Sequence, residues 1–133
     1  MKALTISQPF ASLIADGEKW IENRTWSTNY RGPIAIHAGK GSQYLNKAEL
    51  AEFPTGVVLA VAELTACVEI SQIKWNARSD WSNTIRGTSR TWLDALNHEH
   101  AEGPWCWILD NVTKLELPIS ASGKQGIWDW DES

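Results

Sequence analysis

The stretch GVVLAVAELTACVEI, residues 56–70, is the strongest strand signal in the sequence. It is nearly continuous in Val, Leu and Ala, which is typical of a strand with little exposed surface. Its length predicts a strand that bends or bulges as it follows the wall of a barrel. We therefore expect a small β-barrel that includes this strand.

Shorter elements lie on the N-terminal side of this strand. The pattern of residues 7–17 predicts a short helix that Ser7 caps and that Gly17 ends in a left-handed conformation. Alternating side chains predict strands at 19–26 and 34–38, and residues 44–52 have a weak helical pattern.

On the C-terminal side, residues 105–109 and 115–119 are expected to close the sheet as a hairpin. Residues 71–103 are polar, contain three tryptophans and include a helical pattern at 88–97. That segment is too short for a core of its own. We interpret it as an insertion or lid on a single domain that spans residues 1–133.

Composition points to a soluble protein of the cytoplasm. The hydrophobic content of 43% and the charged content of 21% are ordinary for a globular domain. No stretch is apolar over the length that a membrane span needs, and the N-terminus does not have the pattern of a signal peptide. Cys67 and Cys106 lie in apolar runs, which predicts buried thiols in a reducing compartment.

Charge is distributed unevenly along the chain. The net charge is −4, but residues 1–48 carry six basic and three acidic side chains, so their net charge is +3 and that of the rest is −7. A basic face on an acidic protein favours a small or single-stranded ligand over a long duplex. The nine tryptophans are expected mainly in the core, although some could stack on bases.

Glu63 interrupts the apolar run of residues 57–62. A carboxylate at a half-buried strand position requires a cation or hydrogen-bond donors, and Lys19 and Arg24 are the candidate partners. The residue could act as an acid or base or grip a ligand. A structural ion pair or a solvent-facing side chain at a bend explains it equally well.

Lys19, Glu22 and Arg24 form a second constellation. Alternation places Glu22 and Arg24 on one face of a strand, and Lys19 precedes them at the end of a turn. A lysine beside carboxylates suits a phosphate or a base edge. A plain surface salt bridge has the same sequence pattern.

Several motifs together resemble the ASCH domain family, whose members share the PUA-like β-barrel fold. The most specific of them is G-x-K-x-x-E-x-R at residues 17–24, and the others lie at 4–9, 30–32, 36–38, 56–65 and 123–128. The resemblance implies an α+β fold, a small mixed barrel with short flanking helices, to which residues 71–103 add a polar insertion. It also implies that RNA or a modified nucleotide binds in a cleft beside the barrel.

Some members of the family are enzymes, namely an N4-acetylcytidine amidohydrolase and a metal-dependent ribonuclease. In the amidohydrolase pattern, Lys19 falls on the lysine position and Glu63 on the glutamate position. Glu22 stands where that pattern has a threonine, and a carboxylate cannot serve as the hydroxyl nucleophile. Water activated by Glu63 or Glu22 would be needed instead.

The candidate site combines these observations. Lys19, Glu22 and Glu63 are the candidate catalytic residues, and the candidate ligand-binding residues are Arg24, Trp26, Tyr30, Arg31, His37, Lys40, Lys124 and Gln125. We expect no cofactor and no metal, except a divalent ion if the protein is a ribonuclease. The run His98-Glu99-His100 has no spaced partner that would make it a metal site.

Three functions remain open, and the sequence does not fix the oligomeric state. Binding of RNA or a nucleotide is preferred, followed by hydrolysis of RNA or of a modified nucleoside. The third is a protein-interaction domain that docks through the tryptophans of residues 71–103.

Overall fold

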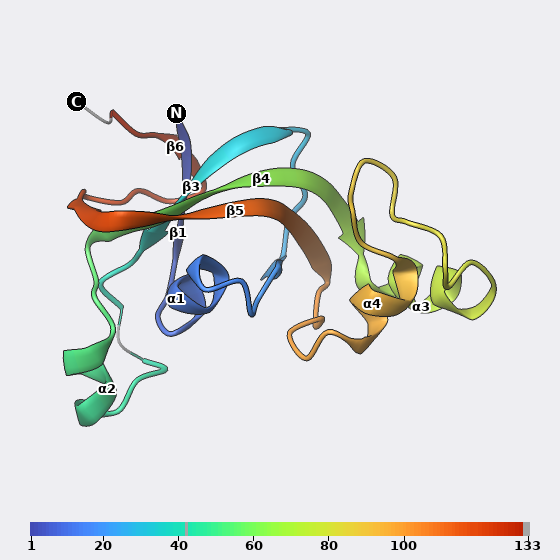
Figure 1. Cartoon of the computed structure of the whole chain (residues 1–133), viewed down its shortest axis with the longest axis horizontal. Helices are drawn as coiled ribbons and strands as arrows, with labels where there is room; N and C mark the ends of the chain where they lie inside the picture. The colour runs from blue at the N-terminus through green and yellow to red at the C-terminus, as the bar shows by residue number, and fades with distance from the viewer. Residues whose placement is uncertain (42, 132–133) are drawn as a thin grey trace. The chain divides into compact units, whose positions relative to one another are not determined.

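The computed structural model describes residues 1–41 and 43–131 and arranges them in six strands and four short helices (Figure 1). The strands are β1 (Lys2–Ile6), β2 (Ile21–Arg24), β3 (Gly32–Ala38), β4 (Val57–Glu69), β5 (Trp105–Ser120) and β6 (Ile127–Asp129). The helices are α1 (Phe10–Ala15), α2 (Lys47–Glu52), α3 (Ile70–Ser79) and α4 (Trp92–Asn97). Within the described part of the chain, no helix is long and apolar enough to cross a membrane.

The strands form one mixed sheet in the order β2-β5-β4-β3-β1-β6. Strand β1 pairs with β3 in parallel and with β6 in the antiparallel sense, while β2 and β5 are antiparallel. A mixed sheet with short helices confirms the α+β class predicted from the sequence. The long strand predicted at 56–70 is also confirmed, because it is β4.

The expected hairpin at 105–109 and 115–119 is wrong. These residues form the single strand β5, which continues through the polar positions that resembled a turn. Asn111 has a φ of 51°, a left-handed conformation that asparagine tolerates better than most residues. The backbone therefore accommodates a local irregularity there without reversing its direction.

Helix α1 ends as predicted and begins differently. Gly17 has a φ of 84°, and its N–H and that of Glu18 bond to the Ile14 and Leu13 carbonyls, which is a Schellman ending. Pro9 is the N-cap residue and Ser7 does not cap the helix. The Gln8 side chain performs this task, since its Oε1 accepts the Ser12 N–H at 2.9 Å.

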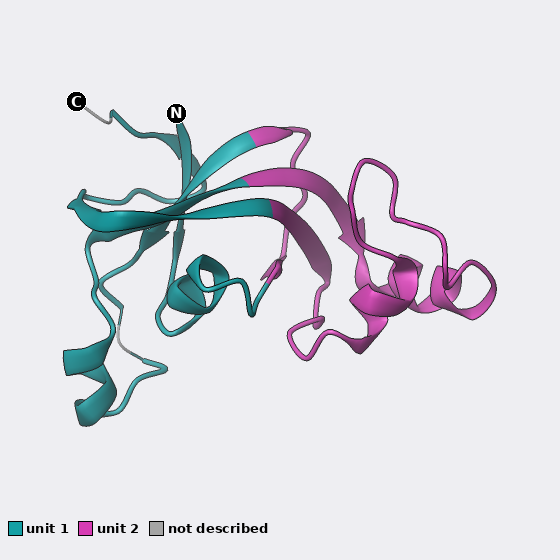
Figure 2. Ribbon diagram, viewed as in Figure 1, with its two compact units in different colours: residues 1–19, 33–62, 111–133 teal, residues 20–32, 63–110 magenta. Residues whose placement is uncertain are grey.

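The chain divides into two compact units (Figure 2). Unit 1 comprises residues 1–19, 33–62 and 111–133, and unit 2 comprises residues 20–32 and 63–110. Strands β4 and β5 contribute residues to both units, as the change of colour along each ribbon shows (Figure 2).

Each unit has its own buried cluster. In unit 1 the cluster is formed by Ala3, Ala35, Val58, Trp128 and Trp130. In unit 2 it includes side chains of β2 and β5 together with Ile73, Ile85 and Trp92 from the 71–103 segment. That segment thus supplies core residues, and its role as a lid stays a prediction. Five of the nine tryptophans are less than 10% exposed, as expected for rings that fill a core.

Candidate functional site

The predicted pairing of Glu22 with Arg24 is confirmed. Glu22 Oε2 lies 2.9 Å from Arg24 Nη2, and both side chains are largely buried in strand β2 of unit 2. Lys19, the last residue of unit 1, is only 2% exposed, and its ammonium lies 5.8 Å from the centre of the Phe10 ring. A lysine so deeply buried requires compensation, so it stays a candidate functional residue.

Glu63 does not occupy the half-buried position expected for it. Its neighbours Ala62 and Leu64 are buried, whereas Glu63 is exposed on the opposite face of β4. The reason is strand alternation, which turns successive side chains to opposite faces. Its placement beside Lys19 and Glu22 in a common cleft stays a prediction.

Asp110 is the buried carboxylate that sequence reasoning missed. It is 4% exposed, and its oxygens accept hydrogen bonds from the Thr65 hydroxyl at 2.7 Å, the Ser89 hydroxyl at 2.7 Å and the Ser89 N–H at 3.3 Å. Arg90 Nε lies 3.5 Å from Asp110 Oδ1, an ion pair without hydrogen-bond geometry. The rule applied to Glu63 could have found it, because Asp110 also ends an apolar run, residues 106–109.

This carboxylate fixes the loop of residues 85–90. The loop is closed by the Ile85 N–H, which donates to the Arg90 carbonyl at 2.7 Å, and Ser89 anchors it to Asp110. The Arg90 guanidinium lies 4.3 Å above the ring of Trp20. The network is therefore a support that holds the loop against the core of unit 2.

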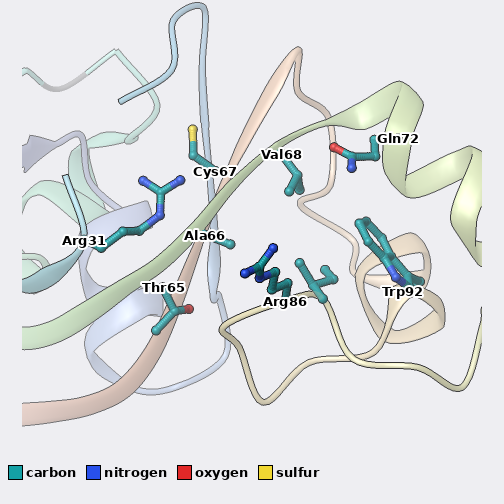
Figure 3. A pocket seen from close by; sticks show the side chains of 9 residues that line it. Arg31, Thr65, Ala66, Cys67, Val68, Gln72, Arg86 and Trp92 are labelled. Atoms are coloured by element: carbon teal, nitrogen blue, oxygen red, sulfur yellow. The ribbon is translucent and has the colours of Figure 1, made fainter. Parts of the chain in front are cut away.

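A pocket of about 190 Å³ lies beside this loop (Figure 3). Arg31 and Arg86 line it together with Cys67, Gln72 and Trp92. In Figure 3, Arg31 and Cys67 lie on one side of the view and Gln72 and Trp92 on the other, with Arg86 between them. Of the candidate ligand residues, only Arg31 belongs to this pocket.

A larger pocket, of about 410 Å³, lies in unit 1. Four candidate ligand residues line it together, namely His37, Lys40, Lys124 and Gln125. They come from the end of β3, the segment that follows it, and the loop between β5 and β6. The sequence predicts these four residues as separate candidates, and the fold brings them together at one pocket.

A chain of hydrogen bonds forms the floor of the unit 1 pocket. His37 Nε2 donates to the Ala121 carbonyl at 2.8 Å, since a carbonyl can only accept. His37 Nδ1 lies 3.1 Å from the Thr5 hydroxyl and accepts its proton when the ring is protonated on Nε2 alone, and Trp128 Nε1 donates to that hydroxyl oxygen at 3.0 Å. The ring of His37, which is 2% exposed, is therefore held from both sides.

Glycine allows the two loops to approach this floor. A Cβ atom on Gly123 would lie 2.5 Å from Thr5 Oγ1 and 2.7 Å from His37 Cε1, and one on Gly39 would lie 2.9 Å from Thr5 Cγ2. Neither position has room for a larger residue without a shift. The Gly123–Gln125 loop is thus seated directly on the histidine.

The remaining candidates lie apart from both pockets. Trp26 is 38% exposed, packs edge-on against Trp107 at 4.7 Å between ring centres, and accepts the Trp107 indole N–H through its carbonyl. Tyr30 sets its hydroxyl against Gly32. In the run His98-Glu99-His100, Nε2 of His98 accepts the backbone N–H of Trp20 at 3.1 Å. Within residues 1–41 and 43–131, no group of three or more His, Cys, Asp or Glu side chains could hold a metal ion.

Comparison with known proteins decides the family. The family model described as the ASCH domain matches residues 4–119, which include β3, β4 and most of β5. The chain belongs to the ASCH domain family.

Solved structures agree with this ASCH fold. The crystal structure of ASCH from Zymomonas mobilis has a TM-score of 0.56 and 16% sequence identity, and the match covers 98% of this chain and 87% of that one. A single-residue variant of the same Zymomonas mobilis protein gives a TM-score of 0.57 at 16% identity, over 98% and 90% of the two chains. The PUA-like fold expected from the sequence is therefore confirmed.

One curated relative is much longer than this ASCH domain. Activating signal cointegrator 1 of Homo sapiens is 23% identical over 149 aligned positions, which cover 96% of this chain and 22% of that protein. The chain thus spans about a fifth of that relative, and the similarity concerns one domain of it.

Proposed function

We propose that this ASCH domain binds RNA or a nucleotide, and that a phosphate group of the ligand occupies the unit 1 pocket. The observation that carries the proposal is the position of Lys40 and Lys124, two exposed lysines on different loops at the edge of one pocket. Family membership and the net charge of +3 over residues 1–48 support it.

The lining of the pocket is suited to an anion. None of its described lining residues is acidic, and the carboxylate on which the charge of Lys124 acts, that of Asp129, lies outside the lining. Ser122 and Gln125 add side-chain donors on the same loop. Phosphate oxygens accept several such bonds at once, and charge-assisted hydrogen bonds are the strong ones.

The two lysines stand on well-defined backbone. The stem of Lys40 lies over Gly56, where an added Cβ would meet its Cε at 3.1 Å. Gly56 donates its N–H to the Ala38 carbonyl at 2.7 Å and accepts the Ala121 N–H at 3.0 Å, which connects the segment before Lys40 with the start of the Lys124 loop. Such preorganisation lowers the entropic cost of binding.

The pocket has no Phe, Tyr or Trp among its described lining residues, and the imidazole ring of His37 in its floor is only 2% exposed. Recognition there would depend on phosphate and sugar, with little discrimination between bases. The volume of about 410 Å³ is within the range of pockets for small ligands. A terminal or exposed phosphate of single-stranded RNA and the phosphate of a free nucleotide both suit it.

Fluorescence anisotropy with a labelled single-stranded RNA of about eight nucleotides tests the proposal. Lys40→Gln and Lys124→Gln should each weaken binding by about tenfold. Each should also reduce the magnitude of the negative slope of log K against log salt by about 0.7, because one phosphate contact is lost. Lys47→Gln is the matched control, because Lys47 is an exposed lysine of unit 1 outside the pocket.

Competition separates the possible sources of the phosphate. A free mononucleotide that displaces the RNA at a Kd close to that of the RNA itself favours a nucleotide ligand, and a much weaker effect favours RNA. The proposal fails if the pocket variants bind like Lys47→Gln.

Hydrolysis is the second candidate, and the burial of Lys19 favours it. In that reaction Lys19 would stabilise developing negative charge, and Glu22 or Glu63 would activate water. Incubation with N4-acetylcytidine and with RNA, with and without a divalent metal, should give products that Glu22→Gln or Glu63→Gln abolishes. Products that persist in both variants would eliminate this assignment.

A further inference from the structure

We propose that the pocket of unit 2 between Arg31, Arg86 and Trp92 is a second ligand site, which binds a small phosphorylated compound that carries a flat ring. The site is distinct from the unit 1 pocket and shares no lining residue with it. It extends the proposed function, because neither the family match nor the Lys40 and Lys124 loops predict it.

The first observation is uncompensated charge. Arg24 and Arg90 each lie beside a carboxylate, Glu22 and Asp110 respectively. Arg31 and Arg86 have no carboxylate within ion-pairing distance among the described residues, and none of the described residues that line their pocket is acidic. Two guanidinium groups in a pocket without acid favour a bound anion, and their planar donors match phosphate oxygens.

The second observation is that both arginines stand on fixed supports. Arg31 Nη1 donates to the carbonyls of Thr28 at 2.7 Å and Tyr30 at 2.8 Å, which orients the guanidinium through neutral groups. Arg86 belongs to the 85–90 loop, which the Ser89–Asp110 hydrogen bond anchors at 2.7 Å. The Asp110 carboxyl group therefore fixes the loop that carries Arg86, a cation without an ionic partner among residues 1–41 and 43–131.

Gly87 brings this loop close to strand β4. Its φ is +86°, and an added Cβ would lie 3.1 Å from the Thr65 carbonyl oxygen. Glycine is needed there both for the left-handed backbone and for the close approach. The neighbouring Arg86 is thereby held over the strand.

The third observation is the nature of the other walls. Val68, Ile85 and Trp92 supply an apolar surface with one aromatic ring, and Gln72 supplies an amide. A volume of about 190 Å³ admits a small ring better than a large ligand. We infer that the phosphate lies on the arginines and the ring against the apolar wall, while the amide of Gln72 bonds to the ring edge.

Cys67 offers a direct readout, since it lines this pocket and Cys106 is fully buried. Burial raises the pKa of the Cys67 thiol, and a backbone hydrogen bond with Thr28 and the charge of Arg31 partly offset this effect. The thiolate is the reactive form, so labelling is measured at mildly alkaline pH. The rate of Cys67 labelling by a dianionic aromatic disulfide is divided by its rate of labelling by a neutral aromatic disulfide. Because both rates depend on the same thiolate fraction, their ratio does not change when a variant changes the thiol pKa.

Arg31→Gln and Arg86→Gln should each lower this rate ratio about threefold at low salt. Arg78→Gln is the matched control, an exposed arginine of unit 2 that stacks on Trp75 outside the pocket. Arg86→Lys retains the charge and should keep the ratio, which separates charge from misfolding. Ratios that stay at the Arg78→Gln value in both pocket variants would overturn the site.

Protection of Cys67 then tests the ligand class. Uridine monophosphate should slow labelling several-fold more than inorganic phosphate, and uridine should have the weakest effect. Equal protection by uridine and its monophosphate overturns the anion site, and equal protection by inorganic phosphate overturns the ring contact. RNA binding that is weakened about tenfold in Lys40→Gln and unchanged in Arg86→Gln keeps the two proposals separate.

Discussion

The two pockets are built on opposite kinds of buried polar support. In unit 1, a chain of hydrogen bonds without a carboxyl group runs from Trp128 through Thr5 and His37 to the Ala121 carbonyl. In unit 2, a carboxyl group, that of Asp110, holds the loop beside the smaller pocket. Burying hydroxyl and ring N–H groups that are hydrogen-bonded costs little desolvation, whereas a buried carboxylate is tolerable only while its partners remain. A substitution that removes a supporting side chain should therefore lower the free energy of unfolding more in unit 2 than in unit 1.

The largest effect is expected for Asp110→Ala. The change removes the acceptor of the Ser89 hydroxyl and one of the two acceptors of the Thr65 hydroxyl, and it leaves the partly buried Arg90 without its ion-pair partner. It should lower the free energy of unfolding by about 3 kcal/mol, reduced from the cost of a fully buried pair because Arg90 can reach solvent. Urea denaturation measures the loss, with Asp80→Asn, an exposed aspartate of unit 2, as control. Equal stability of the two variants would show that Asp110 supports nothing.

Gly123→Ala should have the next largest effect. The added methyl group meets Thr5 and His37 within 2.8 Å, so the loop must move. We expect a loss of about 2 kcal/mol in the free energy of unfolding and a clear loss of RNA affinity. Gly41→Ala is the matched control, because its Cβ would meet nothing within 4 Å. An unchanged affinity in Gly123→Ala would contradict the placement of the ligand on this loop.

Thr5→Val tests the hydrogen-bond chain of unit 1 itself. It keeps the shape but leaves His37 Nδ1 and Trp128 Nε1 without their shared partner. We expect a loss of about 1 kcal/mol in thermal or urea unfolding, less than that for Asp110→Ala. Thr113→Val, an exposed threonine of unit 1, should be neutral. A loss in Thr5→Val larger than that in Asp110→Ala would reverse the comparison between the two units.

The smallest effect is expected for the exposed ion pair of Lys2 and Asp129, 2.9 Å apart. The hydrogen bond from Lys2 lowers the pKa of the Asp129 carboxyl. Its contribution to stability is therefore present above the ordinary aspartate pKa and is lost as the pH falls through the lowered value. Asp129→Asn should be slightly less stable than the parent at neutral pH and equal to it in strong acid. A difference that grows on acidification would contradict this assignment.

Much of the fold could be predicted from the sequence because its signals are local. The apolar run of β4, the glycine that ends α1 and the alternation that pairs Glu22 with Arg24 all act over a few residues. The family motifs gave the α+β, PUA-like class. The continuous strand β5 was missed because Asp110 and Asn111 resemble a turn. That the strand continues through them is seen only from its place between β2 and β4 in the sheet.

The candidate site was only partly predictable. Glu63 and Asp110 are both carboxylates in apolar runs, and the sequence cannot distinguish them without knowing which faces are covered. Residues 106–110 are buried consecutively, whereas residues 62–64 alternate. The floor of the unit 1 pocket joins His37 to Ala121 across 84 positions, and no local pattern encodes that distance.

The exposed tryptophans keep the third function open. Trp75 and Trp81 are 68% and 53% exposed in the 71–103 segment. Deleting the segment would remove Ile73, Ile85 and Trp92 from the core of unit 2, so it would not isolate a docking surface. Replacing Trp75 and Trp81 by serine isolates it, since both side chains are exposed.

Backbone amide shifts in a titration of the isotope-labelled domain with short single-stranded RNA show whether the ligand occupies the unit 1 pocket. We expect the largest changes on residues 39–40 and 121–125, and we expect them to disappear in the Lys40→Gln, Lys124→Gln double variant. Changes confined to residues 19–24 and 63, or persistence of the full pattern in that variant, would place the ligand elsewhere and contradict the phosphate pocket of unit 1.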